Sequence, residues 1–183
     1  MPSPNSMIRK VKARLRRQRL RRGLILLPVI LIALVILVTA LYIPVLQVNG
    51  LSMEPALQGG ETVALYREQS YRPEDIVAFK CQNQILIRRV IALPGSVVSM
   101  DADGNVTVDG VMLEESYISD KDLGICTVTF PCTVPDGHYF VLGDRRSTSL
   151  DSRSSIVGFV EQSDIIGKVF CVLFPFDSFR GIE

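Results

Sequence analysis

The sequence predicts a mainly β protein, in which a coiled antiparallel β-sheet domain follows one N-terminal transmembrane α-helix. Two observations predict the sheet domain. From residue 61 onward, short runs rich in Val, Ile, Phe and Tyr alternate with turn residues, and no stretch carries the long apolar period of an amphipathic helix. A third observation predicts the membrane helix: no charged residue occurs between Arg22 and Glu54.

Residues 23–45 are long enough to cross a bilayer as a helix. About 20 apolar residues, each rising 1.5 Å, match the ~30 Å hydrocarbon core, where backbone polar groups must be bonded internally. Pro28 falls in the first turns, and Pro44 falls where the helix should end. The alternative is a cleavable signal peptide with a small-residue site at 38–40. Its apolar core would usually be shorter, so we favour a retained anchor.

Residues 1–22 form a basic arm that holds nine of the 20 Lys and Arg residues and no acidic residue. The rest of the chain carries 11 basic against 19 acidic residues, a net charge of −8. A basic arm can bind nucleic acid, but its position before an apolar segment points to the cytoplasmic face of a membrane. We therefore expect a basic cytoplasmic arm at 1–22, a transmembrane helix at 23–45 and an extracytoplasmic β domain at 46–183. The lipid bilayer is the expected partner of the anchor, and no nucleic-acid partner is expected.

The expected strands follow one another along the domain with short connections. Gln82 and Asn83 form a plausible tight turn between two of them, and Pro94-Gly95 ends the second. Polar residues dominate 114–122, which we expect to be a surface excursion. The expected strands are 62–66, 76–80, 84–92, 97–100, 106–108, 111–112, 127–130, 138–142, 156–159 and 166–174.

The four cysteines and the single histidine do not follow metal-ligand spacing. No metal and no cofactor are therefore expected. Cys126 and Cys132 could form a disulfide across a short loop in an exported domain, or both could remain free thiols.

Three short stretches carry a recognisable chemical pattern. Residues 52–57 read S-M-E-P-A-L, residues 88–96 read R-R-V-I-A-L-P-G-S, and residues 143–153 read G-D-R-R-S-T-S-L-D-S-R. In order and spacing, and with D-I-V-A-F-K at 75–80 between the first two, they resemble the conserved boxes of the type I signal peptidases. These are membrane-bound endopeptidases that remove leader peptides from exported proteins. The resemblance runs from about residue 20 to the end of the chain.

The resemblance implies a serine nucleophile, Ser52, that forms an acyl-enzyme after activation by a base. The base position holds Arg88, and Ser149 matches a second serine that would orient the base by a hydrogen bond. The Ser52 N–H, in a backbone bent around Gly50, would help to hold the oxyanion. The residues that match a salt-bridged brace behind the site are Asp144, Arg146, Asp151 and Arg153. Asp144 and Arg146 would equally suit an ordinary turn.

The resemblance also implies a substrate, the signal peptide of an exported precursor. Its extended tail, with small residues before the cut, could add as a strand to an exposed sheet edge. The candidate edges are residues 50–52 and 84–90, and the residues expected to face the peptide are Leu51, Met53, Leu86 and Ile87. Met53 could also dip into the outer leaflet, although packing is its plainer role.

The sequence departs from the family pattern at the general base, because the position that holds a lysine in the family holds Arg88 here. Keeping a lysine neutral near pH 7 means lowering its pKa from ~10.4, at roughly 3–4 kcal/mol, whereas an arginine needs about 8 kcal/mol. Arg88 is therefore a poor general base. Three softer departures are Ala56 in place of Thr, Ser96 in place of Asp and Arg145 in place of Asn.

Three interpretations remain open. In the first, the chain is a working peptidase in which Lys80, His138 or a water relayed through Ser149 replaces the base. In the second, it is an impaired or inactive family member that binds leader peptides or pilin-like precursors without cutting them. In the third, the basic arm is the functional part and the outer domain is a scaffold. We favour the first, because Ser52 and Ser149 are both present.

Overall fold

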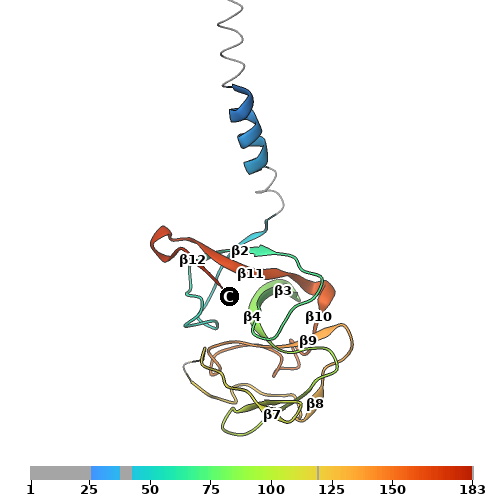
Figure 1. Cartoon of the computed structure of the whole chain (residues 1–183). Helices are drawn as coiled ribbons and strands as arrows, with labels where there is room; N and C mark the ends of the chain where they lie inside the picture. The colour runs from blue at the N-terminus through green and yellow to red at the C-terminus, as the bar shows by residue number, and fades with distance from the viewer. Residues whose placement is uncertain (1–25, 38–42, 119, 183) are drawn as a thin grey trace, which may run out of the picture. The chain divides into compact units, whose positions relative to one another are not determined.

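A computed structural model describes residues 26–37, 43–118 and 120–182 of the chain. The chain divides into two compact units, Met1–Ile43 and Pro44–Glu183. In the first unit, residues 26–37 are helical (Figure 1). Within the described residues, no helix is long and apolar enough to cross a membrane. The basic arm expected at 1–22 lies outside the described residues, as do 23–25 and 38–42 of the expected transmembrane helix.

The expected helix boundary at residue 45 needs a correction. Pro44 lies outside any regular element, and Val45 begins strand β1 (Val45–Gln47). Proline has no N–H to donate to a helical carbonyl, so a helix is not expected to continue through this position.

The second unit is mainly β and entirely antiparallel in its recorded strand pairs, as the sequence predicts. Its main sheet has the order β1-β2-β11-β3-β4-β9-β10, with β12 paired to β11. The strands after β1 are β2 (Thr62–Tyr66), β3 (Ile76–Cys81), β4 (Gln84–Ala92), β9 (His138–Leu142), β10 (Val160–Glu161), β11 (Ile165–Phe174) and β12 (Arg180–Gly181).

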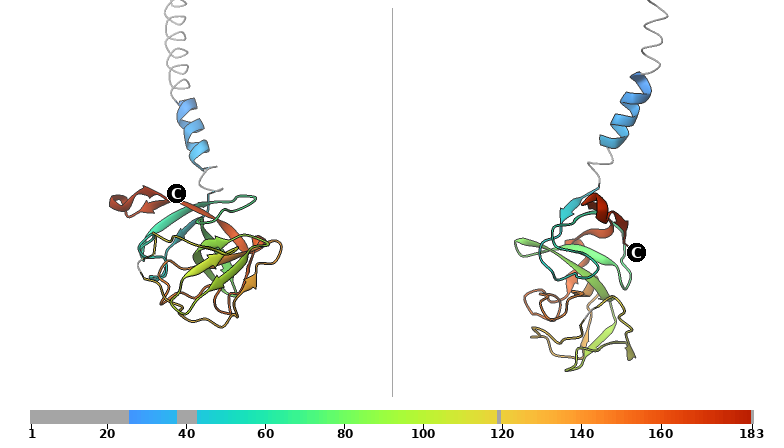
Figure 2. Two further views of the ribbon diagram at one scale, coloured as in Figure 1. Left: turned by 60° about the horizontal axis from the view of Figure 1, so that its bottom comes forward. Right: turned by 90° about the vertical axis from the view of Figure 1, so that its left-hand side faces the viewer.

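A smaller sheet has the order β7-β6-β5-β8. Its strands are β5 (Val97–Met100), β6 (Val106–Val108), β7 (Val111–Met112) and β8 (Cys132–Thr133). Within the β unit, this sheet lies at the end opposite β2 and β12 (Figures 1 and 2). Two short 3-10 helices complete the unit, η1 (Gln162–Asp164) and η2 (Phe176–Ser178).

Two expected strands are wrong. Residues 127–130 form bends rather than a strand, and the N–H groups of Thr127 and Val128 both donate to the carbonyl of Arg153. Residues 156–159 form a turn followed by a bend, because the Ser154 carbonyl accepts from both Val157 and Gly158, as in a helical turn. Local apolar composition suggested strands in both places, but neither segment has a strand beside it to pair with.

Apolar side chains from both faces of the main sheet form three buried clusters. The first cluster contains Met53 and Leu57, together with β-strand residues such as Val63 and Val172. Met53 and Leu57 therefore anchor the segment that carries Ser52 onto the sheet. The third cluster contains Val98 and Val106 of the small sheet with Phe140 of β9, and so joins the two sheets.

Candidate active site

Ser52 lies on a loop, residues 49–60, that we call the Ser52 loop. Two backbone hydrogen bonds close its base, from Val48 N to Glu61 O at 2.7 Å and from Gly60 N to Val48 O at 2.9 Å. Gly50 has a φ of 87°, in the left-handed region that favours glycine, so it lets the chain bend just before Ser52. The sequence prediction that the backbone bends around Gly50 is confirmed.

Arg88 reaches Ser52 from strand β4. Its Nη1 donates to Ser52 Oγ at 2.8 Å and to Ile87 O at 2.5 Å, and its Nε donates to Leu150 O at 2.8 Å. The Arg88 residue is 5% exposed. Burial lowers the pKa of the Arg88 guanidinium below its ordinary value, and the Asp151 carboxylate opposes this effect. The side chain is thus fixed with a donor against the hydroxyl of Ser52.

Ser149 contacts Ser52 through the backbone. The Ser149 Oγ donates to Arg145 O at 2.7 Å and lies 3.2 Å from Ser52 O, while the Arg145 N–H donates to Ser52 O at 3.0 Å. The expected hydrogen bond from Ser149 to the residue at the base position is not among the contacts of the described residues. Arg88 bonds instead to the carbonyl of Leu150, one residue further along. In this structure Ser149 orients the main chain of Ser52 rather than the side chain of Arg88.

A glycine that the motif comparison did not single out allows this close approach. A Cβ on Gly143 would lie 1.8 Å from Ser149 Oγ and 2.8 Å from Ser52 O. Position 143 must therefore be glycine for Ser149 to sit against the Ser52 loop. The Ser52 N–H has no acceptor among the described residues, so it is free to donate to a ligand.

Three buried ion pairs hold the segment 143–153, and two of them are two-pronged. Arg89 binds Asp144 in a two-pronged contact, with Nε to Oδ1 at 2.8 Å and Nη2 to Oδ2 at 2.5 Å. Arg153 binds Asp151 in the same way, with both contacts at 2.8 Å. The second carboxylate also accepts from the Gly143 N–H at 3.0 Å. Asp144 and Asp151 therefore tie this segment to β4 and to itself, as a brace would.

Arg146 binds a partner that the sequence did not indicate. It forms a fully buried ion pair with Glu115, which also accepts from Tyr117 Oη at 2.8 Å. The guanidinium of Arg89 lies 4.2 Å from the centre of the Tyr117 ring. Burial raises the pKa of Tyr117 and that of Asp144, with Arg89 opposing the shift at Asp144. The polar stretch around 115 is thus partly interior rather than only a surface excursion.

An open groove of about 540 Å³ has Ser52 and Arg88 in its lining and lies between β1, the Ser52 loop and the first half of β4. It is lined by residues of β1, the Ser52 loop, β4 and the turn before β4: Leu46, Gln47, Val48, Asn49, Ser52, Met53, Asn83, Gln84, Ile85, Leu86, Ile87 and Arg88. Strand β4 pairs with β3 over residues 84–89, but its pairing with β9 starts only at Arg89. Residues 84–88 therefore present an open strand edge to the groove.

The hydrogen-bond alternation of an antiparallel strand shows which groups face this groove. The Val90 N–H donates to Asp75 O at 2.8 Å, on the β3 side. Every second residue shares that direction, so the main-chain groups of Ile85 and Ile87 point away from β3, into the groove. The Ile87 carbonyl already accepts a hydrogen bond from Arg88 Nη1.

The residues expected to face a peptide divide into two groups. Met53, Leu86 and Ile87 line the groove, although Met53 is 2% exposed and chiefly packs in the core. Leu51 is exposed but is not among the lining residues. Ile85 also lines the groove and lies within the edge 84–90 expected from the sequence, whereas Gln47 of β1 was not predicted, because the sequence does not show that β1 and β4 flank the same groove.

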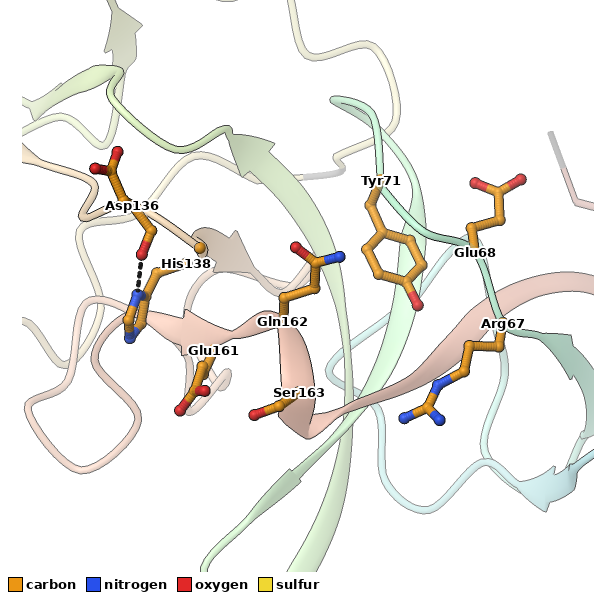
Figure 3. A pocket seen from close by; sticks show the side chains of 9 residues that line it. Arg67, Glu68, Tyr71, Asp136, His138, Glu161, Gln162 and Ser163 are labelled. Carbon is orange, nitrogen blue, oxygen red and sulfur yellow. Dashed lines mark hydrogen bonds between the residues drawn. The ribbon is translucent and has the colours of Figure 1, made fainter.

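Two candidate replacement bases lie away from Ser52. Lys80 is exposed and lies opposite Ile85 in the pairing of β3 with β4. Arg88 lies opposite Val77, so Lys80 is three residues, or about 10 Å, along β3 from the position that faces Arg88. His138 lines a different pocket, with its Nδ1 2.8 Å from Asp136 O (Figure 3). The expectation that either residue replaces the base is therefore not supported by their positions.

Comparisons with known proteins identify the family of this chain. Residues 20–174 match the family model described as signal peptidase, peptidase S26. The chain belongs to this family. A signal peptidase I of Bacillus licheniformis is 35% identical over 156 residues, which cover 78% of this chain and 82% of the relative. Signal peptidase I T of Bacillus subtilis is 35% identical over 153 residues, covering 76% and 78%. A crystal structure of a signal peptidase I from Enterococcus faecalis is 34% identical, with a TM-score of 0.45 over 55% of this chain and 97% of that chain.

The structure shows the contacts of the three other positions that differ from the signal peptidase pattern, Arg145, Ala56 and Ser96. Arg145 Nη1 binds Glu54 Oε2 at 2.9 Å, a half-exposed ion pair that joins the Ser52 loop to the segment 143–153. Ala56 is partly buried against the first core cluster. Ser96 forms main-chain hydrogen bonds: its N–H donates to Leu93 O, and its carbonyl accepts from the Val134 N–H. These three positions change packing and turns rather than the contact between Arg88 and Ser52.

All four cysteines are free in the structure. Cys126 Sγ donates to the Val128 carbonyl at 3.4 Å, and burial raises the pKa of the Cys132 thiol. The structure therefore corresponds to the free-thiol alternative rather than to a disulfide between these two residues.

Proposed function

We propose that this chain is a membrane-anchored serine endopeptidase of the signal peptidase I type, which removes leader peptides from exported precursors after small residues. The observation that carries the proposal is the 2.8 Å hydrogen bond between Arg88 Nη1 and Ser52 Oγ in the lining of an open groove. Membership of the signal peptidase family supports the same reaction class. The alternative of a family member that binds precursors without cutting them finds no support in the comparisons.

The groove suits an extended peptide. The open edge at residues 84–88 is about 16 Å long, which accommodates roughly five residues of a strand. A leader peptide in this groove would bond to the main chain of Ile85 and place its side chains alternately toward and away from the core. The apolar lining from Leu46, Val48 and Leu86 favours small uncharged side chains on the inward face.

Ser52 Oγ is the proposed nucleophile. It attacks the scissile carbonyl carbon, and the oxyanion that forms accepts a hydrogen bond from the free Ser52 N–H. The C–N bond then breaks, the leaving amine nitrogen takes a proton from a groove water, which regenerates hydroxide, and an ester joins Ser52 to the leader. Water hydrolyses this ester, which releases the leader and restores the hydroxyl.

Arg88 acts in this proposal as a donor and a positive charge, not as a proton acceptor. A guanidinium has five N–H donors and no acceptor, and burial alone does not bring its pKa near 7. The charge stabilises the alkoxide character that Ser52 Oγ gains during attack. The Ser52 proton passes to solvent hydroxide in the open groove, so the reaction quickens as the pH rises.

The topology is also part of the proposal. Residues 1–22 would remain in the cytoplasm, 23–45 would span the bilayer, and the β unit would lie outside the cell membrane. The uninterrupted apolar stretch after Arg22 and the basic arm before it support this arrangement. External protease applied to intact cells should remove residues 61–183, and protection of that region would contradict the topology.

Cleavage of a defined peptide tests the function. Purified full-length protein in detergent is incubated with a leader peptide ending Ala-x-Ala and with a matched peptide carrying Phe at both alanine positions. We expect a single cut after the second alanine and at least about tenfold slower cleavage of the Phe peptide, because the larger side chains do not fit the inward face. Equal cleavage of both peptides, or none of either, would contradict the proposal.

A further inference from the structure

The C-terminal hairpin contacts the Ser52 loop. Strand β11 continues through η2 into β12, which folds back so that Arg180 pairs with Val172 (Figure 2). The residues that match the signal peptidase family model end at 174, so η2 and β12 lie beyond the matched region. This part of the chain is therefore not accounted for by the family boxes.

Arg180 carries the contacts from the hairpin to the loop. Its Nη1 binds Glu61 Oε1 at 2.7 Å, and its Nη2 binds Glu61 Oε2 at 3.0 Å. The same Nη2 donates to the carbonyl of Ala56 at 2.8 Å, within the Ser52 loop. A planar guanidinium that binds a carboxylate with two prongs holds a more defined geometry than a single charge contact.

Glu61 connects this contact to the base of the loop. Glu61 is 3% exposed, and its Oε2 also accepts from the Gln58 N–H at 2.9 Å. Its carbonyl accepts the Val48 N–H that closes the loop. One buried carboxylate thus receives bonds from the hairpin and from the loop, and Arg180 is the cation that pairs with it.

We propose that Arg180 is a positioning residue for Ser52, acting through Glu61 and Ala56. The proposal rests on the proposed function, because the purpose of the contact is to fix the nucleophile. Without Arg180 the Glu61 carboxylate loses its cation and the Ala56 carbonyl loses a donor. The half of the loop that follows Ser52 then keeps its apolar anchors, Met53 and Leu57, but loses these polar contacts and can shift slightly relative to Arg88. A displacement of the nucleophile by about 1 Å can lower a rate on the order of a hundredfold.

The test compares Arg180→Gln, Arg180→Lys and the control Arg72→Gln in full-length protein. Arg72 is an exposed arginine on the segment before β3. We expect Arg180→Gln to lower kcat roughly ten- to a hundredfold with KM changed by less than about threefold, because attack is impaired and the groove is not. Arg180→Lys should recover part of kcat, since lysine restores the charge without the two-pronged contact. Arg72→Gln should leave both constants unchanged.

Amide hydrogen exchange supplies a readout that does not depend on cleavage. Arg180→Gln should accelerate exchange within residues 49–60 while strands β3 and β4 keep their wild-type rates. Unchanged exchange at 49–60, or equal acceleration throughout the β unit, would overturn the positioning role. If the wild-type protein cleaves no peptide, the proposed function fails, yet the exchange comparison still decides whether Arg180 holds the loop. If Arg180→Gln does not fold, Arg180→Lys must show the same local acceleration to a smaller extent.

Discussion

Arg88 Nη1 donates a hydrogen bond to Ser52 Oγ at 2.8 Å, while the same guanidinium is held by the carbonyls of Ile87 and Leu150. Three acceptors around one guanidinium leave it little freedom to turn away. Because this group donates and does not accept, the geometry presents a fixed positive charge to the nucleophile rather than a base.

The first prediction concerns Arg88→Lys. A lysine buried at this position can lose its proton at moderately alkaline pH, so the variant should cleave a leader peptide faster than wild type at pH 8–9. The wild-type rate should rise about tenfold per pH unit over the same range, since hydroxide takes the Ser52 proton. Initial rates of both proteins from pH 6 to 10 measure this. A slower rate for Arg88→Lys throughout would show that Arg88 has a role that its charge alone does not explain.

The second prediction concerns Gly143. Because a Cβ at this position would collide with Ser149 Oγ, Gly143→Ala should destabilise the protein by about 1–3 kcal/mol and displace Ser52. Adding Ser149→Gly removes the collision with the serine side chain but leaves the new Cβ 2.8 Å from Ser52 O, so it should restore part of the lost stability. Urea denaturation of the single and double variants gives the comparison. A double variant no more stable than Gly143→Ala would contradict this explanation.

The third prediction compares a buried ion pair with a partly exposed one. Removing one partner of the Arg89–Asp144 pair leaves an uncompensated buried charge, so Arg89→Met should cost about 3–5 kcal/mol of unfolding free energy. Glu54→Gln breaks the half-exposed pair with Arg145 and should cost less than about 1 kcal/mol. Denaturation at pH 7 measures the unfolding free energy of both variants. Similar losses of unfolding free energy in the two variants would show that burial does not set the cost of breaking each ion pair.

The fourth prediction concerns pH and Glu61. Burial of this carboxyl acts to raise its pKa, but the contacts from Arg180 and the Gln58 N–H outweigh burial and leave the pKa below its ordinary value. The folded state therefore holds its proton less tightly than the unfolded state. The stability from this group is present above the ordinary glutamate pKa of about 4.3 and is lost as the pH falls through the depressed value.

Glu61→Gln measures this effect. At pH 7 the variant should be less stable than wild type, and the difference should shrink as the pH falls below about 4. Thermal unfolding from pH 7 to pH 3 follows the difference. A difference that stays constant over the whole range would show that ionisation of Glu61 does not contribute.

Much of the fold could be predicted from local sequence. Strand β4 was expected at the residues where it lies, 84–92, because a strand-length apolar run is bounded by a tight turn and by Pro94-Gly95. Gln82 in that turn has a φ of 53°, as such turns require. The run at 127–130 is also rich in β-branched and aromatic residues but pairs with no strand, and composition alone does not distinguish the two cases.

The site could be predicted only in part. The structure places Arg88 and Ser149 against Ser52, a grouping that the family resemblance had implied. Neither Glu115 nor Arg180 lies in a box, and each pairs with a residue at least 30 positions away. Such tertiary pairs leave no local signal in one sequence. The hydrogen bonds of Ser149 Oγ to the carbonyls of Arg145 and Ser52 were not predicted for the same reason, since they depend on how closely the segment 143–153 approaches the Ser52 loop.

The most direct measurement of the central claim is cleavage of the Ala-x-Ala leader peptide by Ser52→Ala beside the control Ser163→Ala. Ser163 is an exposed serine in the pocket that contains His138. With Ser52 as the nucleophile, Ser52→Ala should give no cleavage above the uncatalysed rate, while Ser163→Ala should retain the wild-type rate. Cleavage by Ser52→Ala at a rate close to wild type would contradict the account.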